Sequence, residues 1–316
     1  MRYLHVDVFT DRPYSGNSLA VFPEAGTLTR AQMLAITREL RHFESVFLTR
    51  DAPDTPESPD ARDARDPAGS RSRRARVFDL AGELDFAGHP LVGAAAVLHA
   101  EAPRGTGPQE EEEADGCTWT LRAPARTVRV TTRRRGPRHY ASTLDQGPAE
   151  FPGRPAGAQA PTGAEIASWF SLRAGDLDPD LPPETVSTGL RYLVVPVRGD
   201  ALARARVATP LDAPLARAGA GYAYLLDAGA MEGRHWTNDG ALEDTATGSG
   251  AGCAAAYLRR HGRIADGEPY VLRQGRFTGR GAEMTVSAYG RGRAVHRVRV
   301  GGGVVIVGEG SLAELP

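Results

Sequence analysis

Hydrophobic and polar positions alternate with a period of two near the start of the chain, which predicts strands. Residues 3–9 place aliphatic side chains on one face, and 19–22 are expected to return as the second strand of a hairpin. A capping box at Thr29 and Gln32 then opens a predicted helix over 30–41. The first part of the chain is therefore expected to form a small sheet with one helix packed on it.

The next predicted strand carries a carboxyl group among apolar neighbours. Within 43–49, the alternation places Glu44 on the same face as Val46 and Leu48. A carboxyl in such surroundings loses hydration, and its pKa rises toward the neutral range that a general acid or base needs. From this fragment alone, a strand-end glutamate in solvent is the alternative interpretation.

The remaining pattern contains many strands, few long helices and two polar segments. Strands are predicted at 118–121, 126–132, 192–197, 222–227, 268–274, 283–288, 294–300 and 304–307, and helices at 90–100, 165–172, 210–218 and 251–261. Residues 51–75 and 101–116 are strongly polar and are expected to be surface loops that do not pack. The mixture favours an α+β fold.

Two stretches that lie 160 positions apart (248 − 88) resemble each other. Residues 88–98 match 248–258 at the glycine, the three alanines and the final leucine, and Asp79, Ala81 and Glu83 match Asp239, Ala241 and Glu243. A repeat of about half the chain indicates two copies of one domain. We therefore predict two pseudo-symmetric domains over 1–125 and 126–316, each a curled mixed β-sheet around a central α-helix, with the last strand able to return to the first half.

Each copy has a loop of small residues before its alanine-rich helix, Ala87-Gly88-His89-Pro90 in the first and Thr247-Gly248-Ser249-Gly250 in the second. Pro90 suits the first turn of a helix, where its missing N–H would have no partner. Because the first N–H groups of a helix are free and its dipole is positive there, two such loops facing each other would hold a carboxylate or an enolate. The alternative is that the glycines only allow close helix packing. The duplication, with a titratable residue in each copy, favours the binding site.

Composition narrows the chemistry that the chain can perform. The 316 residues carry a formal net charge of −1, so neither nucleic acid nor a membrane is expected as a partner. All 38 basic residues are arginine and none is lysine. A Schiff-base mechanism such as that of pyridoxal phosphate is therefore excluded, because it needs a side-chain amine. Two cysteines, Cys117 and Cys253, and the lack of an apolar signal segment favour a reduced, cytoplasmic protein.

Motifs of the common cofactor and metal sites are missing from the sequence. The eight histidines form no His-x-His or His-Glu-x-x-His pattern, and no glycine-rich nucleotide loop follows a predicted strand. We therefore expect no metal and no cofactor. The basic runs 71–76 and 133–135 are interpreted as solvated loop or strand faces rather than binding patches.

Four motifs, taken in order, resemble the PhzF-like family of phenazine biosynthesis. They are Gly16-Asn17, Glu44-Ser45-x-Phe47, Phe86-Ala87-Gly88-His89-Pro90 and Glu243-Asp244-x-Ala246-Thr247-Gly248-Ser249. The resemblance covers nearly the whole chain apart from the two polar segments. The family is similar in fold to diaminopimelate epimerase, which implies two pseudo-symmetric halves with the active site in the cleft between them.

The resemblance implies a cofactor-independent isomerase that moves a proton between carbons of a small carboxylate substrate, such as trans-2,3-dihydro-3-hydroxyanthranilate, in secondary metabolism. By position, Glu44 takes the general acid/base role, while His89, Asp244 and Ser249 hold and polarise the substrate. The same resemblance implies substrate binding by Gly16, Asn17, Gly88, Pro90, Thr247, Gly248 and Gly250. Members of the family are usually homodimers, so a homodimer is expected here.

Two alternatives remain open: a single-base epimerase of a small acid, and a non-catalytic member that binds a small acid. The two cysteine bases of diaminopimelate epimerase correspond to Ala87 and Thr247, so racemisation by two thiols is not supported. Cys253 is interpreted as a buried, inert thiol. Departures from the family pattern, including Ser18 for a proline and Gly250 for an alanine, bear on the substrate more than on the reaction class.

Overall fold

The chain forms two compact units in the computed structural model, which describes residues 1–50, 71–102, 116–157 and 159–316. The first unit consists of Met1–Pro13, Ser18–Leu144 and Gly303–Pro316, and the second of Tyr14–Asn17 and Asp145–Gly302. The first unit thus continues past residue 125, where the sequence predicted the boundary. The strand at Thr127–Arg134 pairs with the strand at Gly116–Arg122, and the strand at His139–Gly147 pairs with Thr127–Arg134 in turn.

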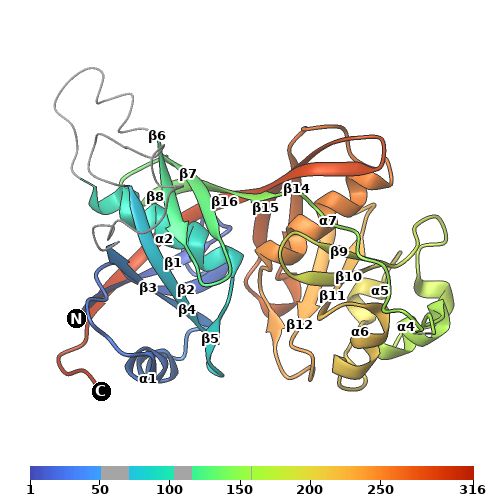
Figure 1. Ribbon diagram of the computed structural model, residues 1–316, viewed down its shortest axis with the longest axis horizontal. Helices are drawn as coiled ribbons and strands as arrows, with labels where there is room; N and C mark the ends of the chain where they lie inside the picture. Colours follow the sequence, from blue (N-terminus) through green and yellow to red (C-terminus); the bar gives the residue numbers. More distant parts are fainter. Residues whose placement is uncertain (51–70, 103–115, 158) are drawn as a thin grey trace. The chain divides into compact units, whose positions relative to one another are not determined.

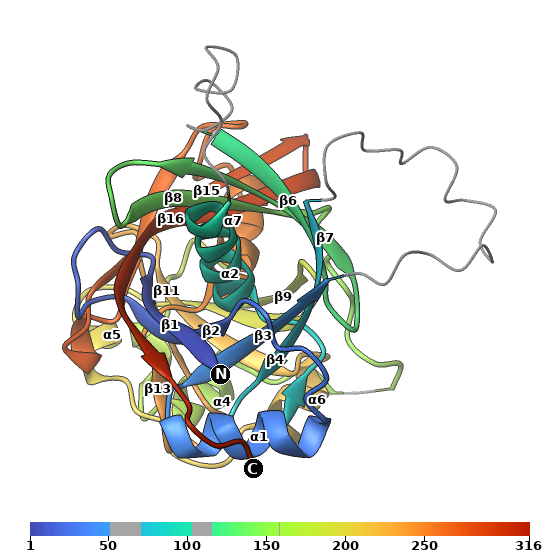
Figure 2. The ribbon, with the colours of Figure 1, turned by 90° about the vertical axis from the view of Figure 1, so that its left-hand side faces the viewer.

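In the first unit a curled sheet surrounds one buried helix, α2 (Figures 1 and 2). The sheet comprises β1 (Arg2–Val8), β2 (Asn17–Phe22), β3 (Glu44–Arg50), β4 (Ser72–Phe78), β6 (Gly116–Arg122), β7 (Thr127–Arg134) and β8 (His139–Gly147), with the two-residue strand β5 (Glu83–Leu84) beside β4. Helix α2 runs over Gly88–Glu101, and every residue from Gly88 to His99 is buried. Its many alanines and glycines suit a helix that touches strands all round.

A second helix, α1 (Arg30–Leu40), covers the outer face of β2, β3 and β4. The predicted capping box is present, since the Thr29 side chain accepts from the Gln32 backbone and the Gln32 side chain accepts from the Thr29 backbone. Under α1, the rings of Phe22 and Phe47 stack at 4.6 Å between centroids. Strand β3 is therefore buried on both faces, with Phe47 toward α1 and the Glu44 face toward α2.

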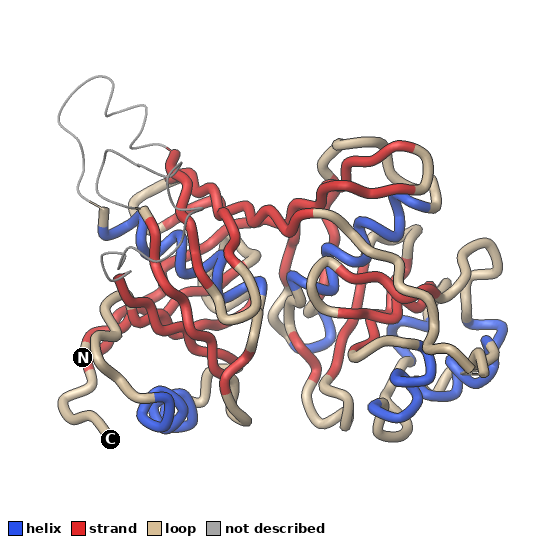
Figure 3. The backbone as a smooth tube through the Cα atoms, in the orientation of Figure 1, coloured by secondary structure: helices blue, strands red, loops and turns tan. Residues whose placement is uncertain are grey.

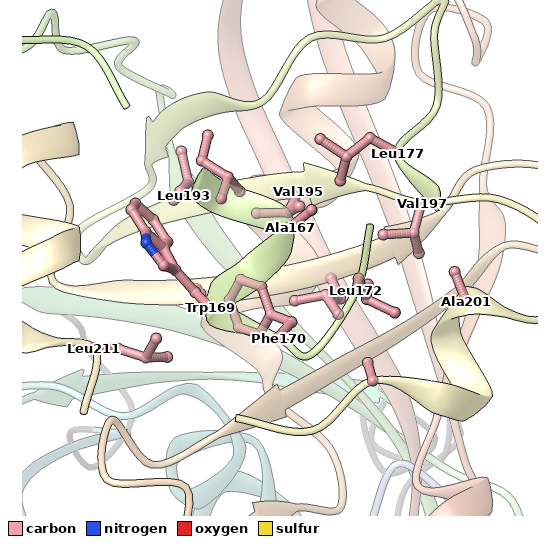
Figure 4. Packing of buried hydrophobic residues seen from close by; sticks show 14 of the residues in the cluster. Ala167, Trp169, Phe170, Leu172, Leu177, Leu193, Val195, Val197, Ala201 and Leu211 are labelled. Atoms are coloured by element: carbon pink, nitrogen blue, oxygen red, sulfur yellow. The ribbon is translucent and has the colours of Figure 1, made fainter. Parts of the chain in front are cut away.

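The second unit repeats this design around helix α7 (Gly248–Arg260) (Figure 1). Its strands are β9 (Glu184–Ser187), β10 (Arg191–Pro196), β11 (Tyr222–Asp227), β12 (Glu232–Trp236), β13 (Glu243–Asp244), β14 (Tyr270–Gln274), β15 (Ala282–Arg291) and the first part of β16 (Ala294–Ser311). The shorter helices are α4 (Gly163–Trp169), α5 (Ala201–Arg204), α6 (Asp212–Ala218), η2 (Ala174–Asp176) and η3 (Arg276–Thr278). Trp169, Phe170 and Leu193 belong to the apolar cluster that joins α4 to the sheet (Figure 4).

Strand pairing is the same in both units. In the first, β2 and β3 are parallel, β3 and β4 antiparallel, β4 and β6 parallel, and β6 and β7 antiparallel. In the second, β10 and β11, β11 and β12, β12 and β14, and β14 and β15 follow the same sequence of directions. Both units place a two-residue strand, β5 or β13, just before the buried helix. The internal repeat in the sequence therefore corresponds to a repeated arrangement of elements.

The turns before β5 and β13 show that the sequence match is structural. Asp79 accepts hydrogen bonds from the backbone N–H groups of Ala81 and Gly82 at 2.8 and 2.7 Å. Asp239 likewise accepts from Ala241 N–H at 3.0 Å. Both aspartates thus form the same side-chain turn, in which a carboxylate binds its own backbone two residues on.

Several elements differ from the sequence expectations. The two strands expected over 294–300 and 304–307 are one strand, β16, because the glycines at 301–303 let the backbone pass close to a neighbour instead of breaking the strand. A Cβ on Gly303 would lie 2.5 Å from the Thr10 carbonyl oxygen. Strands β4, β5, β8, β9, β12 and β13 were not predicted, and β12 is hidden in the sequence by its polar composition, Glu-Gly-Arg-His-Trp. The expected loops 51–75 and 101–116 lie mostly outside the described residues, although Ser72 already opens β4.

Strands make up more of each unit than helices do (Figure 3), which confirms the α+β expectation. Both buried helices begin earlier than predicted, at Gly88 and Gly248, so the small-residue loops form their first turns. Among the described residues, no helix combines the length and the apolar character needed to span a membrane.

Candidate active site

In the first unit, Glu44 and His89 lie next to each other at the start of β3 and of α2. Glu44 is the first residue of β3, and His89 is the second of α2. Both are buried, with 8% and 4% of their surface exposed, and Glu44 Oε2 lies 3.6 Å from His89 Nδ1. The structure therefore places the expected acid/base residue in the protein interior, and not on a solvated strand end.

Burial decides the charge of His89. It lowers the pKa of the imidazole to about 3, because the charged form would lose its hydration. The ring is therefore neutral near pH 7, and the 3.6 Å approach to Glu44 is a contact between a carboxyl and a neutral imidazole. This distance is also too long for a hydrogen bond. A neutral imidazole can donate one hydrogen bond to a substrate without competing for its proton.

In the second unit, Asp244 is held by hydrogen bonds from three groups. Its carboxylate accepts from the Thr247 hydroxyl at 2.6 Å, from Asn17 Nδ2 at 2.8 Å and from the Ala246 N–H at 3.4 Å. Burial raises its pKa to about 6, although these hydrogen bonds lower it. Asp244 is therefore fixed in orientation and titrates close to neutral pH.

Residues Gly16 and Asn17 belong to the short segment of the second unit that comes from the start of the chain. Gly16 has a φ of +62°, a conformation that favours glycine, and its N–H donates to the Gly281 carbonyl at 3.1 Å. Asn17 Nδ2 donates to Asp244 and also to the Ala246 carbonyl, at 2.9 Å. The Gly-Asn motif thus anchors the segment and orients the Asp244 carboxylate.

Ser249 lies in the first turn of α7, beside a residue that the sequence analysis did not select. The Ser249 and Tyr192 hydroxyl oxygens are 2.8 Å apart. Burial raises the pKa of Tyr192 well above its ordinary value, so its hydroxyl remains protonated. Tyr192 is the first residue of the predicted strand 192–197, which was recognised by its aliphatic residues. Nothing in the local sequence indicates that Tyr192 contacts Ser249, 57 positions away.

Gln274 is a second residue that the sequence analysis missed. Its side-chain nitrogen donates to the Asp244 carbonyl at 2.8 Å and to the Thr247 hydroxyl at 3.0 Å, and its oxygen accepts from Thr247 N–H at 3.2 Å. The hydroxyl of Tyr224 donates to the same oxygen at 3.0 Å. Gln274 therefore fixes the turn between β13 and α7.

The small residues at the two helix starts have different tasks. Neither N-cap residue, Ala87 or Thr247, makes a side-chain capping hydrogen bond, and the Thr247 hydroxyl is directed at Asp244 instead. The Gly248 carbonyl accepts from Gln146 Nε2 at 2.9 Å. A Cβ on Gly250 would lie 2.5 Å from Cδ2 of Tyr224, so this glycine is required for packing. The other helix start holds Gly88, His89 and Pro90, all of them buried.

Cys253 behaves as an interior side chain. Its Sγ lies 3.4 Å from the Val186 carbonyl, and burial raises the pKa of the thiol to about 12. At neutral pH it is protonated and therefore a poor nucleophile.

Within each unit, the structure brings together part of the proposed set. Glu44, His89, Gly88 and Pro90 are neighbours in the first unit, and Asp244, Asn17 and Thr247 in the second, where Ser249 lies in the following turn. Across the described part of the chain, no group of three or more histidine, cysteine, aspartate or glutamate side chains could hold a metal ion. Each unit therefore offers one buried carboxyl near the first turn of one buried helix.

Comparison with known proteins identifies the family. A family model described as phenazine biosynthesis-like protein matches residues 6–310. The chain is 30% identical to the trans-2,3-dihydro-3-hydroxyanthranilate isomerase of Pseudomonas fluorescens over 98% of both chains. It is similar to the structure of a predicted epimerase from Pseudomonas aeruginosa, with 43% identity, a TM-score of 0.83 and 99% of both chains covered. A PhzF family protein from Bacillus anthracis shares the fold at 20% identity, with a TM-score of 0.75 and 99% coverage of both chains. The chain is therefore an isomerase of the phenazine biosynthesis-like family.

Proposed function

We propose that the protein moves a proton between two carbons of a small carboxylate substrate similar to trans-2,3-dihydro-3-hydroxyanthranilate, with Glu44 as general acid/base. The observation that carries this proposal is the place of Glu44: a buried carboxyl, 3.6 Å from a buried and neutral histidine. A carbon acid is deprotonated faster by a base that is close and poorly hydrated. The relative from Pseudomonas fluorescens, whose name states this reaction, supports the substrate class.

In the proposed reaction, the Glu44 carboxylate takes a proton from one carbon of the substrate and becomes a carboxylic acid. The electron pair left behind moves through the adjacent double bond toward the next carbon. Glu44 then returns the same proton to that carbon, so that a double bond has shifted and no atom is gained or lost. No external acid, base or oxidant is needed for this balance.

Other residues would hold the charge that develops during this transfer. We propose that His89 donates a hydrogen bond from its neutral ring, and that the first N–H groups of α2 and α7, from Gly88 and Gly248, bind the substrate carboxylate. Asp244 and Ser249 would orient the rest of the substrate. The hydrogen bonds of Asp244 support an orienting task, because a carboxylate that already accepts three of them is held in place.

The test is the activity of Glu44→Gln on trans-2,3-dihydro-3-hydroxyanthranilate, followed by NMR in deuterated water. The substitution keeps the shape of the side chain and removes the base, so kcat should fall about 10³-fold, within the range for general acid/base catalysis. Glu39→Gln, at an exposed position of α1 in the same unit, is the control and should stay within about twofold of the unsubstituted protein. Full activity in Glu44→Gln would refute the role of Glu44.

A second candidate is a single-base epimerase, which the similarity to a predicted epimerase at 43% identity favours. The same Glu44 would then remove and return a proton at one stereocentre. The NMR experiment separates the two reactions. Deuterium at a stereocentre without migration of a double bond indicates epimerisation, whereas a shifted double bond indicates isomerisation.

We also propose, from the family resemblance, that the protein acts as a homodimer, without a cofactor, in the cytoplasm and in secondary metabolism. The dimer is tested by light scattering on the purified chain, which should give twice the mass of the 316-residue chain. A monomeric mass at working concentrations would contradict it.

A further inference from the structure

His235 of β12 lies beside two residues of the candidate site in the second unit. It is the direct cross-strand partner of Asp244 in the antiparallel pair of β12 and β13, so the two side chains are on the same face of this pair. Arg234 and Glu243 bind each other on the opposite face. The His235 ring also meets the ring of Tyr192 edge-on, at 5.5 Å between centroids. The fold thus places an imidazole next to Asp244 and next to the tyrosine whose hydroxyl bonds the first turn of α7.

One nitrogen of this imidazole is already engaged. His235 Nδ1 lies 2.8 Å from the Ala223 carbonyl oxygen. A carbonyl oxygen only accepts hydrogen bonds, so Nδ1 carries the proton, and in the neutral ring Nε2 is the nitrogen with the lone pair. Burial lowers the pKa of His235 to about 4, because the charged form would lose its hydration. The ring is therefore neutral near pH 7, and its Nε2 is a hydrogen-bond acceptor.

This acceptor has no donor among the residues that the structure describes. Only 8% of the His235 surface is exposed, and the hydrogen bond of the side chain is made by Nδ1. The hydroxyl of Tyr192 bonds Ser249 instead, and that of Thr247 donates to Asp244. A buried acceptor without a donor costs stability, and buried polar groups are rarely left in this state. The vacant acceptor beside a candidate substrate-binding residue therefore indicates a donor on a bound molecule.

We propose that His235 Nε2 accepts a hydrogen bond from an amino or hydroxyl group of the substrate. The inference rests on the proposed function and adds to it that the carboxylate substrate also bears a hydrogen-bond donor. An acceptor group at this place would face the lone pair of Nε2 and, close by, an ionised carboxylate that can only accept. His235 and Asp244 together thus select a donor and reject a second carboxylate or a carbonyl group.

The test is calorimetric titration of the full-length protein with three ring carboxylates that cannot isomerise. Anthranilate bears an amino group, 3-hydroxybenzoate bears a hydroxyl group, and benzoate bears neither. His235→Asn keeps a donor for the Ala223 carbonyl near the position of Nδ1 but removes the Nε2 acceptor. It should weaken the binding of one or both donor-bearing ligands about tenfold and that of benzoate less than about twofold. The ligand that loses affinity identifies the group that His235 binds.

Two glutamine variants are the matched controls. His235→Gln returns an acceptor, its amide oxygen, near the position of Nε2 and should bring the affinity back to within about threefold, which a purely structural loss would not allow. His296→Gln, at an exposed histidine of β16 in the same unit, should leave the affinity for all three ligands within about twofold. Unchanged affinity of His235→Asn for both donor-bearing ligands overturns the proposal. An equal loss for all three ligands, or no saturable binding of any of them up to about 10 mM, overturns it too.

Steady-state kinetics separates this proposal from the proposed function. His235→Asn should raise KM about tenfold and leave kcat within about threefold, because it removes a contact made equally in the ground state and in the transition state. Glu44→Gln should lower kcat instead. Full activity of Glu44→Gln would thus refute the role of Glu44 alone, whereas an unchanged KM in His235→Asn would refute the contact of His235 alone.

Discussion

The two units have one design but place chemical groups at different positions on it. In the first unit Glu44 is paired with Leu19 at the start of two parallel strands, and in the second Tyr222 is paired with Tyr192 at the same point. The carboxyl of the first copy therefore corresponds to a phenol in the second. The duplication preserved the scaffold and not the chemistry.

Two further equivalent positions also carry different side chains in the two units. The second residue of the buried helix is His89 in one unit and Ser249 in the other. The second residue of the short strand is Leu84 in one and Asp244 in the other. Each unit thus keeps one carboxyl near its helix start, but on a different strand. A repeated scaffold can in this way carry two unlike sets of groups.

Burial also shifts the pKa values of His89 and Asp244 in opposite directions. Burial lowers the pKa of His89 to about 3 and raises that of Asp244 to about 6. In both cases the neutral form is favoured, because each group lies away from water. Near pH 7, His89 is thus uncharged, whereas Asp244 is mostly ionised and depends on its hydrogen-bond donors.

The largest expected difference between the units is kinetic. His89→Ala should lower kcat/KM about 10³-fold, because the variant loses a hydrogen-bond donor to the developing charge. Ser249→Ala, at the equivalent helix position, should lower kcat/KM only about tenfold, because it loses one neutral hydrogen bond. The measurement is steady-state kinetics on the substrate of the Glu44 test, with melting curves to verify folding. Equal losses in the two variants would mean that the two helix starts have equivalent tasks.

A smaller effect is expected in the pH dependence of stability. The pKa of Asp244 is about 6 in the folded state against 3.8 as the ordinary value, so the folded state holds more protons between pH 4 and 6. Stability from this group is therefore present at low pH and is lost as the pH rises through 6. A shift of about two pKa units corresponds to about 3 kcal/mol.

Urea unfolding at pH 4 and pH 7 measures this loss in the unsubstituted protein and in Asp244→Asn, which cannot titrate. The unsubstituted protein should lose about 2 kcal/mol more than the variant between the two pH values, since the unfolded aspartate is already partly ionised at pH 4. His89 gives the reverse trend: its pKa is lowered, so its stability is present above pH 6.5 and is lost toward pH 3. Parallel curves for the unsubstituted protein and Asp244→Asn would contradict the raised pKa of Asp244.

The smallest effect concerns the glycines at the helix starts. Gly250→Ala places a Cβ 2.5 Å from Tyr224 and should cost about 2 kcal/mol of unfolding free energy, as overpacking does. Gly82→Ala is the control, since no atom lies within 4 Å of its added Cβ, and it should stay within about 0.5 kcal/mol. Thermal melting measures both. Unchanged stability with a raised KM in Gly250→Ala would show that this glycine contacts the substrate rather than Tyr224.

Much of the fold could be predicted because its signals are local. The capping box of α1 depends on two side chains three positions apart, and the aspartate turns before β5 and β13 repeat within the matched stretches. Strand β12 could not be predicted in this way. Its Arg234 is almost fully buried, because Glu243 binds it at 2.6 Å and the rings of Trp236 and Phe277 flank it at 4.3 and 4.1 Å. Such a burial depends on partners that only the folded chain brings together.

The residues of the candidate site likewise differ in whether a local sequence signal reveals them. Glu44, His89 and Asp244 were selected because they belong to motifs, and all three are buried. Tyr192 and Gln274 were missed, since their partners Ser249 and Asp244 lie 57 and 30 positions away. Residues that hold a reactive group by a long-range hydrogen bond leave no pattern in one sequence.

The passage of the chain between the units has a consequence for dissecting the protein. Residues 14–17 belong to the second unit although the first surrounds them in sequence, and residues 303–316 return to the first. No single cut of the gene therefore yields two complete modules: a fragment ending at Leu144 lacks its terminal strand, and the remainder lacks the Gly-Asn anchor of Asp244. Each half depends on a piece encoded inside or beyond the other, so an isolated half is expected to need that piece supplied as a separate peptide or by permuting the gene.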